Sequence, residues 1–182
     1  ALKAERATQF NVLDYGAVGD GVANDTTAIQ TAINACNAAG GGRVFLPVGT
    51  YKITTTIRML SEVELFGVGP LSVIKPVFPT TSPNRAIDND WVTGSTNMVL
   101  RNFKLDRSEA NLSHGMLFNG VINFLIDGVE VSGQSVNNSG AICVSGILGT
   151  GVTDLESKNV RVVNSHFADF HNFGFQVGYV DG

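Results

Sequence analysis

Apolar residues along this chain come in short alternating runs separated by glycine, asparagine and other turn-forming residues. Such runs stand at 10–15, at 43–47 (RVFLP) and at 63–67 (VELFG). Alternation with a period of two is typical of β-strands, because successive side chains point to opposite faces. We therefore expect many short strands, with tight turns between them.

One segment has a different period. Its apolar residues recur at i, i+3, i+4 and i+7, which places them on one face of an α-helix: Ile29, Ala32, Ile33 and Cys36. Asn24 or Asp25 can cap the start of this helix, and the glycines at 40–42 end it. We predict a helix over 25–39 whose apolar stripe covers another part of the protein.

A ten-residue unit recurs three times, at spacings of 26 and then 36 residues. It begins at Asn97, Asn123 and Asn159. In each unit the second, fourth and ninth places are apolar, and the sixth place is Asn or Gly, residues that turn the chain. An antiparallel sandwich would also have short strands, but it would not require the same corner residue in each unit. The repeat therefore favours a solenoid of parallel strands.

A second strand signal follows each unit, as GMLFN, GAICV and GFQVG, which begin at Gly115, Gly140 and Gly174. Superimposing these signals gives one set of inward positions: Met116, Phe118, Ala141, Cys143, Phe175 and Val177. Leu117 and Ile142 then point outward, with Val144 near them. Exposed apolar ladders need a cover, which a subunit interface or a packed loop would supply, and we expect a homotrimer.

Composition narrows the classes of partner. The 182 residues are 43% hydrophobic and 15% charged, with a formal net charge of −4, so no nucleic-acid partner is expected. No apolar run approaches the roughly 18 residues of a membrane span, so no membrane insertion is expected. Cys36 and Cys143 lack CxxC spacing and are predicted to be buried free thiols, which leaves the compartment open.

The segment FNVLDYGAVGDGVANDTTAIQTAINACNAAGGGRVFLPVGTYKI at 10–53 resembles the N-terminal signature of the pectate-lyase-like superfamily. Bacteriophage tailspike depolymerases, pectin-active glycoside hydrolases and mannuronan C5-epimerases share it. The resemblance implies an all-β fold, a right-handed parallel β-helix with an N-terminal capping α-helix. We expect a lead or neck at 1–9, the cap and first coil at 10–53, and further coils at 54–182, truncated at the C-terminus.

The resemblance also implies a function. It favours a phage tailspike that binds and depolymerises a bacterial surface polysaccharide, outside the cell or on the virion surface. Alternatives are a secreted pectin- or alginate-active hydrolase, lyase or epimerase, and a non-catalytic glycan-binding or stalk module. Enzyme status stays open: a catalytic full-length protein would be a polysaccharide lyase or glycoside hydrolase.

The segment at 172–178 tests the epimerase alternative. It resembles the Tyr-Gly-Phe-Asp-Pro-His active-site segment of that family. Phe173 stands for the tyrosine, Gln176 for the aspartate and Gly178 for the histidine. Neither the phenol acid nor the base is present, so epimerase chemistry is not expected at this segment.

Candidate catalytic residues are Asp106, Glu109 and His114, which lie together in the sequence between two paired strand signals. Loops at such places line the clefts of solenoids, and carboxylates and imidazoles serve as general acids and bases. The alternative is a polar turn.

Candidate substrate-binding residues come from two places. Trp91 and Asp88 lie in the longest stretch that reads as irregular, 78–96, where an indole ring could stack on a sugar. Lys104, Glu130 and His166 share the eighth place of the repeat and are expected to form an outward ladder. The alternative to substrate binding is that this ladder consists of ion pairs between neighbouring coils on a solvated face. The same ion pairing is expected for Arg101 and Asp127 at the fifth place.

No metal or cofactor is expected. His166, Asp169 and His171 are separated by a predicted turn, and GAVGDG at 16–21 lacks the Lys-Ser/Thr of a phosphate-binding loop.

Overall fold

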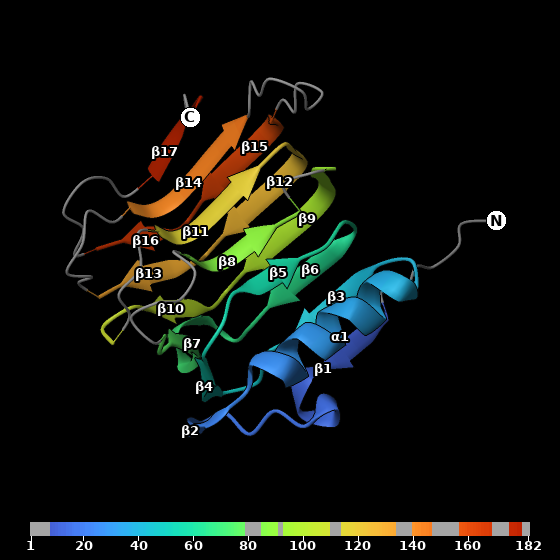
Figure 1. The fold of residues 1–182 in the computed structure, drawn as a ribbon, viewed down its shortest axis with the longest axis vertical. Helices are drawn as coiled ribbons and strands as arrows, with labels where there is room; N and C mark the ends of the chain where they lie inside the picture. The colour runs from blue at the N-terminus through green and yellow to red at the C-terminus, as the bar shows by residue number, and fades with distance from the viewer. Residues whose placement is uncertain are drawn as a thin grey trace.

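The computed structural model describes residues 8–78, 85–90, 93–109, 114–133, 140–146, 157–168 and 175–179. Every strand pair in it is parallel, and the strands form three sheets that run the length of the molecule. The chain is therefore a right-handed parallel β-helix, as the repeat and the resemblance predicted. Figure 1 shows the coils stacked from the N-terminal end to β17.

Each full coil contributes one strand to each sheet. Sheet A holds β1 (Gln9–Asn11), β3 (Gly42–Phe45), β6 (Val63–Phe66), β9 (Ser95–Arg101), β12 (Val121–Asp127) and β15 (Lys158–Val163). Sheet B holds β2 (Asp20–Asn24), β4 (Gly49–Ile53), β7 (Ser72–Pro76), β10 (Lys104–Asp106), β13 (Glu130–Ser132) and β16 (His166–Phe167). Sheet C holds β5 (Ile57–Met59), β8 (Arg85–Asn89), β11 (His114–Asn119), β14 (Gly140–Gly146) and β17 (Phe175–Tyr179).

The α-helix α1 (Thr26–Ala38) takes the place of a sheet C strand in the first coil, between β2 and β3. Its buried face includes Ile29 and Ile33, both without solvent exposure. The side chain of Gln30 accepts a hydrogen bond from the Arg58 N–H (2.8 Å) and donates one to the Arg58 carbonyl (3.0 Å). This amide pairs with β5 as a neighbouring strand would, so the helix covers both the core and the edge of sheet C.

The cap differs from the prediction in two details. The strand ends at Asn11, and residues 12–15, predicted as strand, form the 3₁₀ helix η1 (Val12–Tyr15). Asp25 occupies the N-cap position of α1 without a capping bond from its side chain, and the Thr26 N–H donates to Asn24 Oδ1 (3.2 Å). Asp25 instead accepts from the N–H groups of Val18 and Gly19, so this buried carboxylate closes the glycine-rich loop.

The predicted corner residues adopt the left-handed conformation. The φ angles of Asn97, Asn123 and Asn159 are 53°, 57° and 53°. Each amide donates to the one before it: Asn159 to Asn123 and Asn123 to Asn97, both at 2.9 Å. The sixth place repeats this conformation, with φ of 52° at Asn102 and 65° at Gly128. The column of corners therefore fixes both the turn and the register of successive coils.

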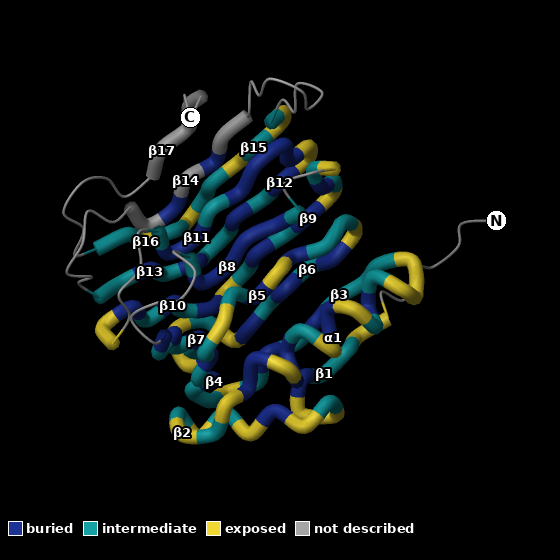
Figure 2. Tube along the Cα trace, viewed as in Figure 1, coloured by how far each residue is buried: buried dark blue, intermediate teal, exposed yellow. Residues whose placement is uncertain are grey.

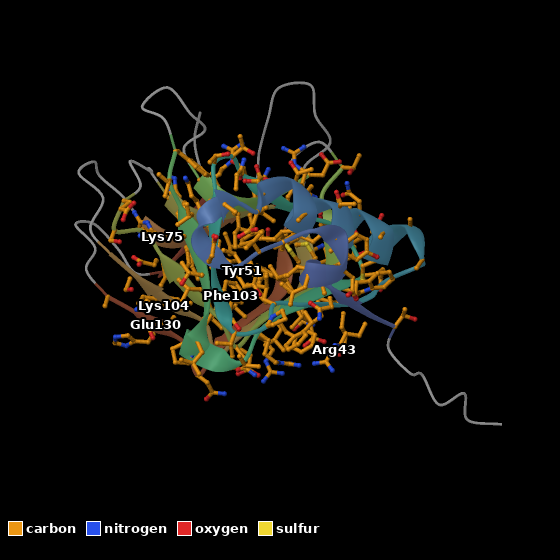
Figure 3. All side chains as sticks on the ribbon, turned by 90° about the horizontal axis from the view of Figure 1, so that it is seen from below. Arg43, Tyr51, Lys75, Phe103, Lys104 and Glu130 are labelled. Atoms are coloured by element: carbon orange, nitrogen blue, oxygen red, sulfur yellow. The ribbon has the colours of Figure 1, made fainter. Side chains whose placement is uncertain are left out.

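The interior is filled by apolar side chains that stack from coil to coil. Met98 pairs with Phe124, and Leu100 with Ile126, and all four are almost fully buried. Figure 2 shows this buried core along the strands, and Figure 3 shows Tyr51 and Phe103 inside the coils. Cys36 belongs to the same core as a free thiol, as predicted, and burial raises its pKa to about 11.

The predicted outward ladder of sheet C is wrong in β14. His114, not Gly115, pairs with Gly140, so Ile142 and Val144 pair with Met116 and Phe118. Ile142 and Val144 are fully buried. A shift of one residue exchanges the two faces of a strand, and the superposition of the glycines was off by one. The apolar ladder that argued for a homotrimer is therefore not formed.

A second correction concerns 78–96, which was predicted to be irregular. Residues 85–89 form β8, which pairs with both β5 and β11 in sheet C. The charged residues Arg85 and Asp88 hid this strand in the sequence, because buried charges break the expected alternation. Trp91 lies outside the described residues.

The corner column yields a first prediction. Asn123→Ala should lower the free energy of unfolding by about 2 kcal/mol, because alanine is strained at φ 57° and both amide hydrogen bonds are lost. Asn123→Gly keeps the conformation and should cost about 1 kcal/mol. Urea unfolding of the two variants measures the difference. Equal losses would show that the backbone conformation contributes nothing at this corner.

Candidate functional site

The outer face of sheet C is the part of the surface with the longest loops beside it. In the fourth coil, β9 and β10 are joined only by Asn102 and Phe103, whereas residues 107–113 connect β10 to β11. Residues 133–139 make the corresponding connection in the next coil. Loops beside a rigid sheet are where binding and catalytic residues concentrate. The outer face of sheet C is therefore the part of the described surface where binding and catalytic side chains are most expected.

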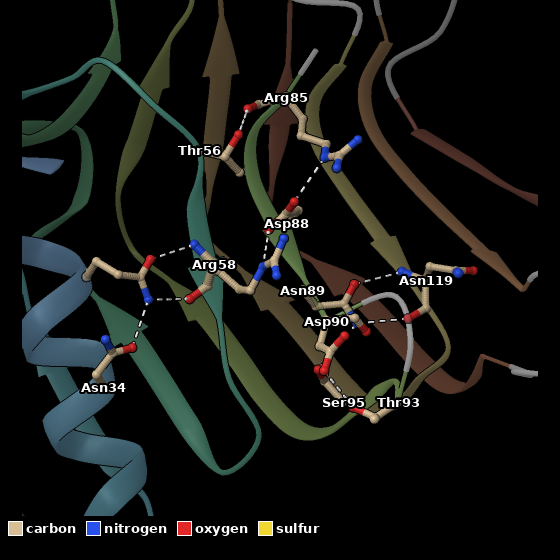
Figure 4. Close-up of polar contacts among 11 residues, drawn as sticks. Asn34, Thr56, Arg58, Arg85, Asp88, Asn89, Asp90, Thr93, Ser95 and Asn119 are labelled. Atoms are coloured by element: carbon tan, nitrogen blue, oxygen red, sulfur yellow. Dashed lines mark hydrogen bonds and ion pairs between the residues drawn. The ribbon is translucent and has the colours of Figure 1, made fainter. Parts of the chain in front are cut away.

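Asp88 on β8 is the centre of a charge cluster on this face. Its side chain is only 1% exposed, and it lies between two arginines (Figure 4). Arg58 Nε is 3.3 Å from Asp88 Oδ1, and Arg85 Nε is 2.9 Å from Asp88 Oδ2. Arg58 lies on β5, one strand away, and keeps 54% of its side chain exposed. Much of its guanidinium therefore remains open to a ligand.

Neighbouring polar groups hold the two arginines in place. The Gln30 side chain binds the backbone of Arg58 and also donates to Asn34 Oδ1 (3.1 Å). The Thr56 hydroxyl donates to the carbonyl of Arg85 (2.8 Å). The helix that caps the core thus also fixes the strand from which Arg58 projects.

His114 begins β11 in register with Arg85. Burial, the charge of Arg107 and the charge of Arg85 together lower the pKa of His114 below its usual 6.5. Arg107 is fully buried, and desolvation lowers its pKa to about 10. An imidazole with a lowered pKa is neutral at pH 7 and can accept a proton.

The ladder predicted at the eighth place is confirmed, and it lies on sheet B. Lys104, Glu130 and His166 pair in register, and Lys104 Nζ lies 2.7 Å from Glu130 Oε1. Figure 3 shows Lys75, Lys104 and Glu130 on one outer side and Arg43 on another. This arrangement matches the cross-rung ion pairs that were the alternative to substrate binding.

The ladder at the fifth place lies on the outer face of sheet A. Arg101 Nη1 contacts Glu64 Oε1 at 2.8 Å, and its Nε contacts Asp127 Oδ2 at 3.4 Å. Arg43 joins the same network through Glu64 Oε2 at 2.8 Å and covers the ring of Phe66. The charges of this face are thus balanced by one another.

The three residues predicted to be catalytic make separate contacts. Asp106 Oδ1 accepts a hydrogen bond from the Ser108 N–H at 3.0 Å, a turn-forming contact. Glu109 Oε1 lies 2.6 Å from Lys75 Nζ on sheet B. His114 is on sheet C, with Asp88 on the neighbouring strand. Asp88 pairs with Leu117, three residues after His114 in β11, so the structure does not pair Asp88 with His114, and the roles of these residues stay predictions.

Sequence reasoning missed Arg58 and Arg107 and noted Arg85 only as a charge beside Trp91 that could bond a sugar hydroxyl. Arg58 occupies an outward place in a predicted strand, Arg85 lies in the stretch that read as irregular, and Arg107 follows directly after Asp106. No motif joins them, because their proximity arises from coil stacking. Counting the charged residues at outward positions of each predicted strand could have identified Arg58, but not Arg85 or Arg107.

In the sheet C cluster two arginines, Arg58 and Arg85, contact one carboxylate, in a chain whose net charge is −4. Asp88 is the one carboxylate among its described side chains, so the pair of carboxyl groups used by glycosidases is not formed there. Arginines favour carboxylate or sulfate groups, which they can bind through two parallel hydrogen bonds. The cluster is thus suited to an anionic ligand and to proton abstraction.

A metal centre and a membrane-spanning helix each need a recognisable arrangement of residues. Within the described residues, no group of three or more His, Cys, Asp or Glu side chains is placed to hold a metal ion. In the same part of the chain, no helix is both long and apolar enough to cross a lipid bilayer.

Comparisons with known proteins identify the family to which the chain is similar. A family model described as rhamnogalacturonase A/epimerase, pectate lyase-like, matches residues 9–174. The mannuronan C5-epimerase AlgE1 of Azotobacter vinelandii is 37% identical over 124 residues, 62% of this chain and 9% of that protein. AlgE4 of the same organism is 56% identical over 124 residues, 62% of this chain and 22% of the epimerase. The chain thus spans a small part of these relatives.

A solved structure shares the architecture. The pre-mature gene product 12 of bacteriophage phi29 superimposes with a TM-score of 0.73 at 25% sequence identity. The match covers 92% of this chain and 23% of the phage protein.

The buried carboxylate gives a second prediction. Asp88→Asn should lower the free energy of unfolding by about 3 kcal/mol, because two partly buried arginines lose their counter-charge. Arg58→Gln, at a more exposed position, should cost less than about 1 kcal/mol. Chemical denaturation at pH 7 compares the two variants. A loss for Asp88→Asn no larger than that for Arg58→Gln would contradict a structural role for the buried charge.

The lowered pKa of His114 gives a third prediction. The unfolded chain binds this proton more readily than the folded one, so stability is full above pH 6.5 and falls as the pH drops below it. His114→Gln cannot titrate and should lose less stability between pH 7.5 and 5. Urea unfolding of both proteins at several pH values isolates the contribution of this residue. Parallel curves would mean that the histidine pKa is unchanged by folding.

Proposed function

Since the chain belongs to the rhamnogalacturonase A/epimerase, pectate lyase-like family, we propose that its sheet C face binds and processes an acidic polysaccharide. One observation carries this proposal: the partly exposed Arg58 contacts the buried Asp88 on the outer face of sheet C, and His114 begins β11, the next strand of that sheet. In a carbohydrate-active β-helix, such a face provides both a group that binds an anion and a group that accepts a proton.

Each group has a distinct role in the proposed reaction. Arg58 binds the carboxylate of a uronate residue, and Asp88 keeps the arginine oriented by holding its Nε. His114 accepts the proton on the carbon next to that carboxylate, and the nearby cationic side chains stabilise the negative charge that develops. Elimination and epimerisation share this first step. The match to mannuronan C5-epimerases supports a uronate polymer of the alginate type.

Two other assignments use the same surface. The first is a phage tailspike that binds and depolymerises a bacterial surface polysaccharide, and its support is the likeness in fold to the phage phi29 protein. A non-catalytic adhesin would need the arginine cluster but not the proton transfer by His114. Product formation separates the adhesin from the enzymes.

The fourth prediction tests binding. Titration calorimetry with alginate, polygalacturonate and neutral dextran should detect binding to the two acidic polymers only, and the affinity should fall with salt. Arg58→Gln should weaken binding about tenfold or more, because a charge-assisted hydrogen bond is lost. The matched control is Arg43→Gln on sheet A, which should bind as the wild type does.

The same preparations test the chemistry. Incubation with alginate should release oligosaccharides that absorb in the ultraviolet if elimination occurs, or change the ratio of the two uronates if epimerisation occurs. His114→Gln should keep the affinity and lose the product. Tight binding without either product would favour the adhesin, and equal affinity for dextran would contradict the proposal.

A further inference from the structure

The exposed side of helix α1 continues the outer face of sheet C. The helix takes the place of a sheet C strand in the first coil and lies next to β5 (Figure 1). Gln30 on the helix forms hydrogen bonds with both the N–H and the carbonyl of Arg58, so no gap separates helix and strand. A ligand bound to the Arg58 side chain therefore has α1 as its neighbour towards the N-terminal end of the solenoid.

This helix carries no charged residue. The thirteen residues of α1 include no Lys, Arg, Asp or Glu. Its exposed positions include Thr27, Thr31 and Asn34, which share one side of the helix with the half-buried Gln30. Threonine and asparagine are weaker helix formers than alanine, glutamate or lysine, the residues that best stabilise an exposed helix face. Helix stability therefore does not explain this neutral polar face, and the outer faces of the three sheets do carry charges.

Hydrogen bonds that start from sheet C orient the amide of Asn34. Gln30 is held by its two bonds to β5 and donates through Nε2 to Asn34 Oδ1 at 3.1 Å. The Asn34 oxygen is thereby occupied, and within the described part of the chain its Nδ2 makes no hydrogen bond. Figure 4 shows Asn34 on the helix beside the strand that carries Arg58. The surface next to Arg58 therefore presents two oriented N–H donors.

Thr31 adds an acceptor beside these donors. Its hydroxyl donates to the Thr27 carbonyl at 2.7 Å, so its proton is used and its oxygen is left to accept a further hydrogen bond. Thr31 and Asn34 are three residues apart on the helix, which places their Cβ atoms roughly 5 to 6 Å from each other. A hydroxyl group both donates and accepts hydrogen bonds. Two neighbouring hydroxyls of one sugar can therefore bind Asn34 and Thr31 together.

The lack of charge on α1 suits an acidic polysaccharide. Asp or Glu at these positions would repel a polyanion, and Lys or Arg would compete with Arg58 for its carboxylates. Amide and hydroxyl groups avoid both effects and match the hydroxyls that each sugar carries beside its carboxylate. The chemistry of the helix face is thus complementary to the part of the polymer that Arg58 does not recognise.

We propose that Thr31 and Asn34 form a binding subsite, which we call the helix subsite. It binds hydroxyl groups of the sugar next to the one whose carboxylate binds Arg58. Gln30 is a positioning residue, because it connects the backbone of Arg58 to the amide of Asn34. This inference rests on the function proposed for sheet C, and it adds that the polymer extends from Arg58 over the capping helix.

Titration calorimetry with alginate octasaccharides at about 50 and 300 mM salt tests the helix subsite, because salt screens charges but not neutral hydrogen bonds. Thr31→Ala/Asn34→Ala should weaken binding about tenfold at both salt concentrations, since it removes two uncharged hydrogen bonds. Arg58→Gln should instead reduce the salt dependence of binding. Alanine favours the helix at both positions, so the cap should stay folded, as circular dichroism can check.

The matched control is Gln9→Ala, which removes an exposed neutral side chain from β1 of sheet A and should bind as the wild type does. Asn34→Ala alone, with an expected loss of about threefold, provides a second test if the double variant fails to fold. Unchanged affinity of these variants, or a loss confined to low salt, would overturn the helix subsite and leave the function proposed for sheet C intact. A wild type that binds no acidic oligosaccharide would overturn both.

Discussion

The structure depends on the stacking of parallel strands in a fixed register, which the corner residues impose. Asparagine at 97, 123 and 159 adopts a left-handed conformation in successive coils, and its amide binds the same residue one coil away. A slip of one residue would break that ladder and turn the buried face outward. Outward side chains can therefore form ladders only with partners that the register selects, and the ion pairs of sheets A and B arise in this way.

The register also requires an end to the stack, and helix α1 supplies it. An uncovered first coil would expose a core cross-section and the unpaired edge of sheet C. The helix buries an aliphatic stripe over the core, and Gln30 occupies the hydrogen-bonding groups of Arg58 on that edge. Capping and the candidate site are thus physically connected, since the residue that Gln30 holds is also the arginine most open to ligand.

The sheet C cluster departs from the rule that outward rungs balance their charges in pairs. Two arginines contact the buried carboxylate of Asp88, and burial, together with the charges of Arg107 and Arg85, lowers the pKa of His114. Burying such an excess of one charge is costly, because desolvation penalises each cation. On sheets A and B the neighbouring charges neutralise one another and give no comparable field. This contrast is the reason to place anion recognition on sheet C.

The sequence by itself determined the β-helix, the cap and the corner positions, because each depends on local features: period, helical spacing and left-handed asparagines at Asn97 and Asn123. It also determined the ladders of sheets A and B, whose units superimpose without ambiguity. Only the tertiary structure decided which side chains of β14 point inward, because its register differs by one residue from the superposition of the glycines and buries Ile142. It also revealed β8, a strand within a charged segment. The candidate site belongs to this second group, since Arg58 and Asp88 lie in different coils and only stacking brings them into contact.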